Sequence, residues 1–325
     1  MEKPRIDILV PLFNPNPEFL RQALDSILHQ TEQRFNVFVN DDASDNDVSS
    51  VIQPYLQDPR FHFSKNSVRL GIGGNWNECL NVALCAKPGS PFIQYLFQDD
   101  RWYFTYLNEM LAVFDTHPTI GFASADHLYD CEKNIPTESL YDNLRTFKND
   151  HLAPGIHQGE KFLQWWLTHQ LHPNVIGEPS FVMMRREVVH GMGKFREDMP
   201  QFLDVEYWTR LLLCTDWYFH PQELGVFRVH RKAASFINDE QGTGIFDRFR
   251  CFQHLLKAAP PYLHRDIEQS RNAALKTMVG KFFDRIHNKT SVSTKGSGTL
   301  PGFCLRHPLL IGKAVVKVLR ERLAK

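Results

Sequence analysis

The chain has 325 residues, 42% of them hydrophobic, and its 37 Lys and Arg residues balance 37 Asp and Glu residues. This length allows one large domain or two smaller ones with a real core, and a net charge of zero gives no basic field for nucleic acid. Six scattered cysteines without a CxxC pair argue against a thiolate zinc site. No apolar run approaches about 20 residues, so we expect a soluble, cytoplasmic protein.

Strand and helix patterns alternate along the first third of the chain. Residues 6–13 form an almost continuous apolar run, typical of a buried parallel strand, and residues 17–30 show helical spacing after a capping Asn16. The same reading predicts strands at 34–42, 60–64, 91–100 and 119–129, and helices at 47–56, 75–86 and 104–117. This alternation predicts βαβ units and an α/β fold, with a mostly parallel central sheet flanked by helices.

The pattern changes after residue 125. Residues 125–200 are less regular and precede an ordered block, and beyond residue 231 the pattern is helical. The later expected elements are a helix at 204–213, a strand at 217–230, and helices at 245–259, 260–287 and 308–325. A stretch rich in Ser, Thr and Gly at 288–302 is typical of a linker. We therefore predict a main domain at 1–235 and a helical C-terminal extension at 236–325.

Polar side chains follow three of the expected strands. Asn14 comes after the first, Asp41 and Asp42 after the second, and Asp99 and Asp100 after a later one. Because the carboxyl ends of parallel strands meet at one edge of a sheet, we expect these side chains to converge. Crowded carboxylates repel one another unless a cation or hydrogen-bond donors compensate, and Mg²⁺ or Mn²⁺ with a substrate phosphate would do so. The plainer alternative is that these acids form turns or cap helices.

Several stretches, in order, resemble family 2 glycosyltransferases, which have a GT-A fold. The stretch DILVPLFNPNPEFLRQALDSILHQTEQRFNVFVNDDASDN is similar to the opening signature of the family, and NSVRLGIGGNWNECLNVA to its glycine turn and helix. LFQDD resembles the Asp-x-Asp region, GKFREDMPQFLDVEYWTRLLL the acceptor-side helix, and FRVHRKAAS the closing Arg-x-His segment. These blocks span roughly residues 6–235, and the remainder of the chain falls outside the resemblance.

The resemblance implies a role for each matching residue. Asp204 would be the catalytic base, Asp100 and His230 would contact a divalent cation, and the nucleotide would be held by Pro11, Phe13, Asn14, Asp41, Asp42 and Asp99. Two purely structural alternatives are that Asp204 caps its helix and that His230 only makes structural hydrogen bonds.

Some positions carry a weaker assignment or depart from the family. Asn75 and Trp76 are candidates for contact with the donor or acceptor, the alternative being a helix start with one core aromatic. Leu203 stands where the family often has Glu, which leaves Glu206 as a second candidate for the base. Gln98 stands where an acid is frequent, and its role is unexplained at this level.

Together these roles imply an inverting, metal-assisted glycosyltransferase with Mg²⁺ or Mn²⁺ as cofactor. It would move a hexosyl or deoxyhexosyl group from a nucleotide-diphosphate sugar to a hydroxyl of a glycan acceptor, with a lipid-linked acceptor in bacterial surface polysaccharide synthesis as one option. A sugar nucleotidyltransferase is one alternative, although PLFNPNPEF lacks the expected Gly-rich basic loop. A non-catalytic sugar-nucleotide-binding protein is the other.

The last expected helix is basic. It carries Lys313, Lys317, Arg320 and Arg322 among apolar residues. Such a helix can pack against the main domain, or it can lie on anionic lipid as an interfacial helix. Peripheral contact with the inner face of the membrane is therefore a second hypothesis for location.

Overall fold

A computed structural model of the protein describes residues 3–87, 89–133, 135, 138–233, 236–238, 246–287 and 305–323. Its centre is a nine-stranded sheet in the order β3-β2-β1-β4-β8-β6-β9-β5, with β7 paired to β9. The strands are β1 (Ile6–Leu12), β2 (Phe35–Asp41), β3 (Phe61–Lys65), β4 (Phe92–Tyr95), β5 (Arg101–Trp102), β6 (Phe122–Cys131), β7 (Gly155–His157), β8 (Val182–Arg185) and β9 (Trp217–Val229).

Most strands run in one direction. The pairings place β1, β2, β3, β4, β6 and β9 parallel to one another and the short β5, β7 and β8 antiparallel to them. All seven residues of β1 are buried, as expected for a central strand covered on both faces. The predicted α/β fold with a mostly parallel sheet flanked by helices is confirmed.

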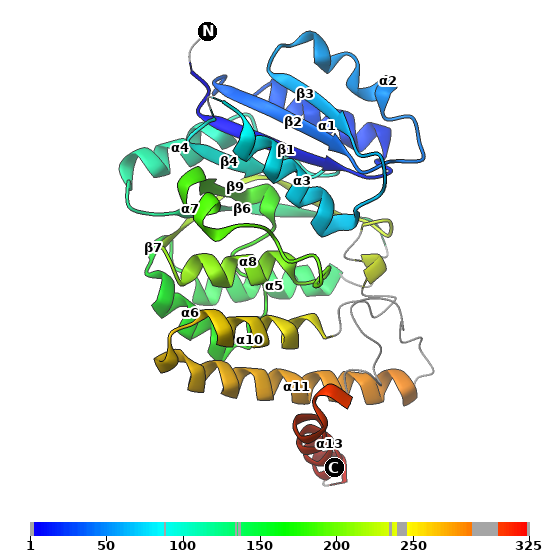
Figure 1. Cartoon of the computed structure of the whole chain (residues 1–325), viewed down its shortest axis with the longest axis vertical. Helices are drawn as coiled ribbons and strands as arrows, with labels where there is room; N and C mark the ends of the chain where they lie inside the picture. Colours follow the sequence, from blue (N-terminus) through cyan, green and yellow to red (C-terminus); the bar gives the residue numbers. More distant parts are fainter. Residues whose placement is uncertain are drawn as a thin grey trace.

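Helices cover both faces of the sheet. Two apolar cores lie on opposite faces, one formed with α1, α2 and α4, the other with α3, α6, α8 and α10. The helices are α1 (Pro17–Leu28), α2 (Ser49–Ile52), α3 (Gly71–Cys85), α4 (Tyr106–Thr116), α5 (Glu138–His151), α6 (Gly159–Thr168), α7 (Arg186–Met192), α8 (Leu203–Leu212), α10 (Asp247–Ala258), α11 (His264–His287) and α13 (Pro308–Leu323). Figure 1 shows the layers stacked from the N-terminal strands to α13.

Three elements differ from the sequence reading. The strand expected at 91–100 is only β4, because the chain then turns so that β5 can join β9. The helix expected at 47–56 is the short α2 and a 3₁₀ turn, since Pro54 cannot donate to a continuing helix. The irregular middle contains α5 and α6, which the sequence reading did not predict, although the buried residues Phe162, Leu163, Trp166 and Leu167 of α6 fall at helical spacing.

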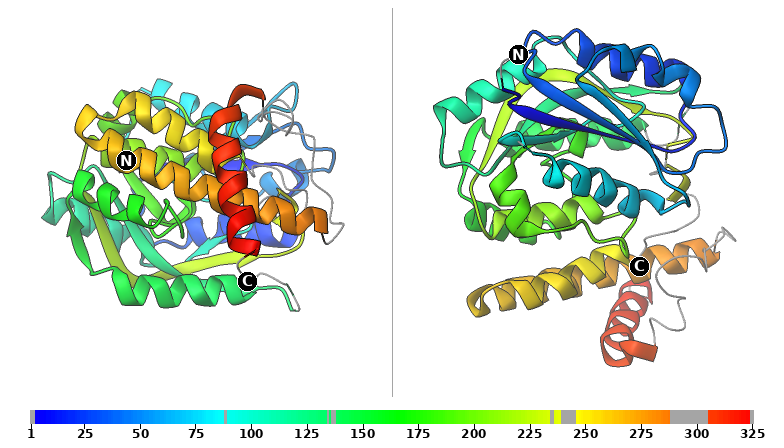
Figure 2. Two further views of the ribbon diagram at one scale, coloured as in Figure 1. Left: turned by 90° about the horizontal axis from the view of Figure 1, so that it is seen from below. Right: turned by 45° about the horizontal axis from the view of Figure 1, so that its top comes forward.

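The C-terminal helices form successive layers beyond α8. Cys251, Phe252 and Leu263 of this region belong to the larger core, and α13 packs on α11 through Ala314 and Val318. In Figure 2 α13 crosses α11 at the end of the molecule furthest from β1 to β3. The expected linker at 288–302 lies outside the described residues, and the domain boundary at 235 stays a prediction. Among the described helices, none is both long and apolar enough to cross a bilayer.

Candidate active site

The ends of β1 and β2 meet at one edge of the sheet. Leu12 pairs in register with Asp41, and the Asn14 backbone N–H donates to Ser44 Oγ at 2.8 Å. Asn14 has φ of +43°, a left-handed conformation that asparagine tolerates better than most residues. Pro11 lies buried within β1. This edge is where the sequence predicted a ligand site.

Gln98 fixes the turn after β1. Its Nε2 donates to the Phe13 carbonyl at 3.1 Å, and its Oε1 accepts from the Phe13 N–H at 2.8 Å. An acid at this position could accept but, when ionised, could not donate. The Gln98 amide therefore suits this position because it both donates to and accepts from the Phe13 backbone, a contact between distant segments that the sequence does not reveal. The Phe13 ring is partly buried, and the Arg69 guanidinium carbon lies 3.8 Å from its centroid.

Asp41 and Asp42 are both buried and make different contacts. Asp41 accepts from the Ser44 N–H at 3.1 Å and lies 3.1 Å from the partly exposed Lys65 Nζ. Both Asp42 oxygens are engaged, by the N–H groups of Leu70 and Gly71 at 2.7 and 2.8 Å and by Asn66. Asp42 therefore anchors the start of α3.

Asp99 and His230 meet across the sheet edge, whereas the resemblance placed Asp100 with His230 at the cation and Asp99 at the nucleotide. Asp99 Oδ2 lies 2.9 Å from His230 Nε2, and their side chains are 20% and 16% exposed. His230 follows β9 and Asp99 follows β4, so the contact forms only in the folded chain. Both side chains are partly open to solvent. A carboxylate suits both Mg²⁺ and Mn²⁺, whereas an imidazole suits a transition-metal ion such as Mn²⁺ better than Mg²⁺.

Asp100 is fully enclosed, unlike its neighbour. Ser180 Oγ donates to Oδ2 at 2.5 Å, and the Arg228 backbone N–H donates to Oδ1 at 3.0 Å. Burial, and then the adjacent charge of Asp99, raise the pKa of Asp100 well above its ordinary value. A cation beside this pair would offset the repulsion. In the described part of the chain, no three His, Cys, Asp or Glu side chains are grouped so that they could hold a metal ion.

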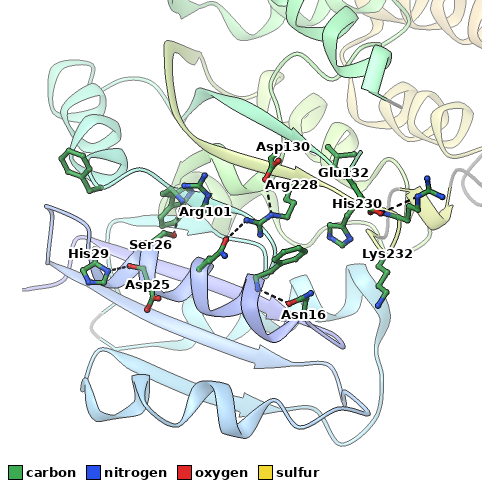
Figure 3. A pocket seen from close by; sticks show the side chains of 16 residues that line it. Asn16, Asp25, Ser26, His29, Arg101, Asp130, Glu132, Arg228, His230 and Lys232 are labelled. Atoms are coloured by element: carbon green, nitrogen blue, oxygen red, sulfur yellow. Dashed lines mark hydrogen bonds and ion pairs between the residues drawn. The ribbon is translucent and has the colours of Figure 1, made fainter. Parts of the chain in front are cut away.

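Arg228, which the sequence reading missed, organises this end of the site. Its guanidinium donates to the Asp99 carbonyl and to Gln22 Oε1, both at 2.7 Å, and stacks 4.0 Å from the Phe19 centroid. It also forms one wall of a groove of about 1040 Å³ beside α1, with His230 (Figure 3). The strand-like stretch FRVH did not indicate this role of Arg228 beyond the family resemblance, because Asp99 and Gln22 are distant in sequence.

Asp204 lies in the first turn of α8, but it is not the cap. The residue at the cap position is Phe202, so the capping alternative is wrong. Asn174 Nδ2 donates to Asp204 Oδ2 at 3.0 Å, and the Val205 N–H donates to Oδ1 at 2.7 Å. Burial raises the pKa of Asp204 to about 7, the Val205 hydrogen bond opposes this, and the charge of Glu178 adds to it. A carboxyl group of this kind suits proton transfer near neutral pH.

The remaining candidates make structural contacts. Glu206 is buried and forms a two-oxygen ion pair with Arg210 Nε at 2.9 and 3.1 Å. Asn75 donates to the Leu12 carbonyl at 3.1 Å, which ties α3 to the end of β1. Trp76 stacks on Phe97 with centroids 4.6 Å apart. These contacts fit the structural alternative given for Asn75 and Trp76, a helix start with one core aromatic.

Comparison with known proteins adds a sequence match. Residues 7–190 match the model of the family described as glycosyl transferase family 2. An uncharacterized protein of Mycobacterium tuberculosis is 34% identical over 226 residues, which are 70% of this chain and 67% of that protein. An uncharacterized glycosyltransferase of Methanocaldococcus jannaschii is 31% identical over 85 residues, 26% of this chain and 29% of its own length.

Two solved structures share the fold. Staphylococcus aureus TarS 1-349 in complex with UDP-GlcNAc has a TM-score of 0.60 at 15% identity, covering 97% of this chain and 81% of that one. The mannosyltransferase PcManGT of Pyrobaculum calidifontis, in complex with GDP-Man and Mn²⁺, has a TM-score of 0.57 at 18% identity, covering 98% and 88%. The GT-A architecture expected from the sequence is therefore confirmed.

Proposed function

The chain belongs to glycosyl transferase family 2 and is a glycosyltransferase, and from this premise we propose that it transfers a sugar from a nucleotide-diphosphate donor to a hydroxyl of a glycan acceptor, with inversion. The observation that carries the proposal is the pairing of two unlike sites. Asp99 and Asp100, from the turn after β4, and His230, from the end of β9, form a crowded acidic edge, whereas Asp204, with a pKa raised to about 7, lies on α8. Leaving-group stabilisation and proton removal need such separate groups.

The donor end would hold the nucleotide. Phe13 and Asn14 line the open part of the sheet edge, with Arg69 over the Phe13 ring. Asp41 is buried behind them and lies beside Lys65. Pro11 and Asp42 would act by fixing the backbone, since both carboxylate oxygens of Asp42 already accept hydrogen bonds from residues 66–71. Relatives of the same fold are described with UDP-GlcNAc and with GDP-Man, which supports a nucleotide-sugar donor.

Asp99 and His230 would hold the divalent cation, with Asp100 behind them as a buried source of negative charge. The sequence assigned Asp99 to the nucleotide and Asp100 to the cation. The complete burial of Asp100, and its contacts with Ser180 and Arg228, favour Asp99 as the cation ligand instead. When bound, Mg²⁺ or Mn²⁺ would neutralise charge that develops on the departing diphosphate.

Asp204 would take the proton of the acceptor hydroxyl. A hydroxyl is a weak nucleophile, so a base on the face of the sugar opposite the leaving group is required, and a single displacement then inverts the anomeric centre. Asn174 holds one carboxylate oxygen and the first turn of α8 holds the other, which fixes the orientation of the base.

A titration tests the donor assignment. We expect UDP, dTDP or GDP to bind the protein in calorimetric titration, with at least one of them bound more tightly when Mn²⁺ is present. Transfer would then be assayed with sugar derivatives of the nucleotide that binds. If none of the three nucleotides binds with Mn²⁺, the proposed function is wrong.

The rate of transfer should depend on pH through Asp204. The base acts when ionised and its pKa is raised to about 7, so kcat should rise between about pH 6 and pH 8 and then level off. Asn174 donates a hydrogen bond to Asp204, and the charge of Glu178, from the turn before β8, contributes to the raised pKa of Asp204. Measurement of kcat across this range at saturating donor checks the prediction. A flat profile would point to a different base.

We also propose that α13 contacts an anionic membrane surface, which would suit a lipid-linked acceptor. Its inner side packs on α11 through Ala314 and Val318, whereas an apolar stripe faces solvent: Leu309 is 80% exposed, Val316 49%, Leu319 44% and Leu323 88%. On a helical projection Lys313, Lys317 and Arg320 lie along one side of this stripe. An exposed apolar stripe with basic residues beside it is typical of an interfacial helix.

Charge reversal tests the membrane contact. Replacing Lys313, Lys317 and Arg320 together by Glu should weaken binding to phosphatidylglycerol vesicles by at least about tenfold, because each basic residue near such a surface contributes about 1 kcal/mol. Vesicle sedimentation measures the change. The matched control reverses three exposed lysines elsewhere, Lys87, Lys161 and Lys257, and should bind as the parent does. Equal binding by both triple variants would contradict the proposal.

A further inference from the structure

Glu178, His127 and Tyr129 form a buried polar cluster that the roles above do not use. His127 and Tyr129 lie on the same side of β6, just where its pairing with β9 is irregular, and Glu178 comes from the turn before β8. Irregular pairing of this kind often redirects side chains beside active sites. The His127 ring stacks on Phe181, with centroids 4.1 Å apart and planes at 11°, which holds it in place.

The cluster has hydrogen-bonding capacity that the described residues do not satisfy. Glu178 Oε2, both ring nitrogens of His127 and the Tyr129 hydroxyl are enclosed without a hydrogen-bond partner. Glu178 Oε2 lies 3.0 Å from His127 Nε2, close enough for charge attraction but without the geometry of a hydrogen bond. Such groups are costly to bury, at about 1–3 kcal/mol each, unless a partner satisfies them.

The position of the cluster is fixed by the segment 174–180. At one end of this segment Asn174 donates to Asp204, and at the other end Ser180 donates to Asp100. Glu178 lies between them, and Gly177 makes the turn with φ of +106°. Burial is the main cause of the raised pKa at Asp100 and at Asp204, and the charge of Glu178 contributes to both. The cluster is therefore near both the leaving-group end and the base.

Glu178 is anionic in this setting. Burial alone would raise its pKa, but the interaction with His127, then a backbone hydrogen bond and the charge of Lys148, which pairs with Asp126, outweigh burial and lower it. The His127 side chain has no exposed surface, whereas the Glu178 side chain is 17% exposed. The carboxylate is thus supported from behind and reaches the open side of the cluster.

We infer that Glu178, supported by His127, accepts a hydrogen bond from a hydroxyl of the donor sugar. This inference rests on the proposed function, because a sugar joined to the diphosphate must lie between Asp100 and Asp204 for the acceptor to attack it. A carboxylate at this point selects neutral sugars with a free hydroxyl and repels uronic acid donors. Glu178 is a specificity residue in this reading.

The test compares sugar nucleotides with the nucleotide alone. The probes are UDP, UDP-glucose and UDP-glucuronate, with GDP and GDP-mannose as a second set, titrated in Mn²⁺. Glu178→Gln keeps the shape of the side chain and should leave the Kd of the bare nucleotide unchanged. It should lower the ratio Kd(UDP)/Kd(UDP-glucose), or the GDP equivalent, by about tenfold, because a hydrogen bond to a charged group is lost. Discrimination against UDP-glucuronate should relax.

The controls separate the possible failures. Glu187→Gln removes the same charge from an exposed position on α7 and should change neither ratio. If Glu178→Gln fails to fold, Glu178→Asp, which retains the charge but withdraws the carboxylate, should lower the same ratio. Unchanged ratios in a folded Glu178 variant overturn the inference and leave the proposed function standing. Failure of the wild type to bind any nucleotide overturns both.

Discussion

Replacing Asp204 by asparagine is expected to lower kcat by about 10²–10⁴-fold, while binding of the nucleotide with Mn²⁺ is retained. Asparagine keeps the size of the side chain and one carbonyl oxygen for Asn174 or Val205 to reach, but it cannot take a proton. The donor end, built from segments near Asp41, Asp99 and His230, is not changed. A transfer assay and a calorimetric titration on the same preparation give the two readouts.

The matched control is Glu206→Gln, two residues along the same helix. Its carboxylate is committed to Arg210, so this variant should lose stability rather than the chemical step. Transfer by Asp204→Asn at the wild-type rate, together with loss of transfer in Glu206→Gln, would move the base to Glu206.

Stability against pH gives an independent view of the same carboxyl group. The folded-state pKa of Asp204, about 7, lies above its ordinary value, so the folded state holds the proton more tightly than the unfolded chain. The contribution of this group is therefore present in full below about pH 4 and is lost as pH rises to about 7, by at most about 4 kcal/mol. The free energy of unfolding of wild type minus that of Asp204→Asn should fall across this window and then stay constant.

Replacing Asp99 by asparagine should weaken Mn²⁺-dependent nucleotide binding by about 10–100-fold, the range seen when a metal site loses a supporting or ligating group. Asp99 is the carboxylate of the acidic pair that reaches solvent, and its partner His230 is also partly open. Titration of the nucleotide with and without Mn²⁺ measures the change, and the metal-independent part of the affinity should remain.

Asp100→Asn provides the comparison. The Arg228 N–H can still donate to the amide oxygen, and Ser180 Oγ can turn to accept from the amide nitrogen. The raised pKa of Asp100 is consistent with a neutral side chain at this position. We expect a weaker effect than in Asp99→Asn, since the charge is lost but no exposed ligand is removed. Loss of Mn²⁺-dependent binding in Asp100→Asn, with Asp99→Asn unaffected, would restore the assignment made from the sequence.

The sequence predicts best those features that depend on local patterns. The burial of β1, the cap at Asn16 and the strand that ends at Asp41 follow from periodicity and composition, because neighbouring residues decide them. The family resemblance then supplied Asp204 and His230. The antiparallel direction of β8 could not be read in this way, since it is set by pairing with β4 and β6.

Other parts of the site depend on contacts between distant segments. The reciprocal bonds of Gln98 with Phe13 join the turns that follow β4 and β1, and Arg228 joins β9 to Asp99 and α1. The segment 174–180 has no periodic signal, and its role follows from the side chains at its two ends, Asn174 and Ser180. Sequence patterns indicate that such residues are polar, but not which group each one meets.

The place of β8 in the sheet has a consequence for how the protein is made. β8 joins β4 to β6, yet both of those strands precede it in the chain. During synthesis, β1 to β4 can pair as soon as they emerge, whereas β6 must wait with an open edge until β8 is available. His230, which meets Asp99, emerges later still. We therefore expect the nucleotide half to form on the ribosome before the active site is complete. A chain stalled before β8 would leave one edge of β4 and both edges of β6 without their partners, and such edges can capture another chain.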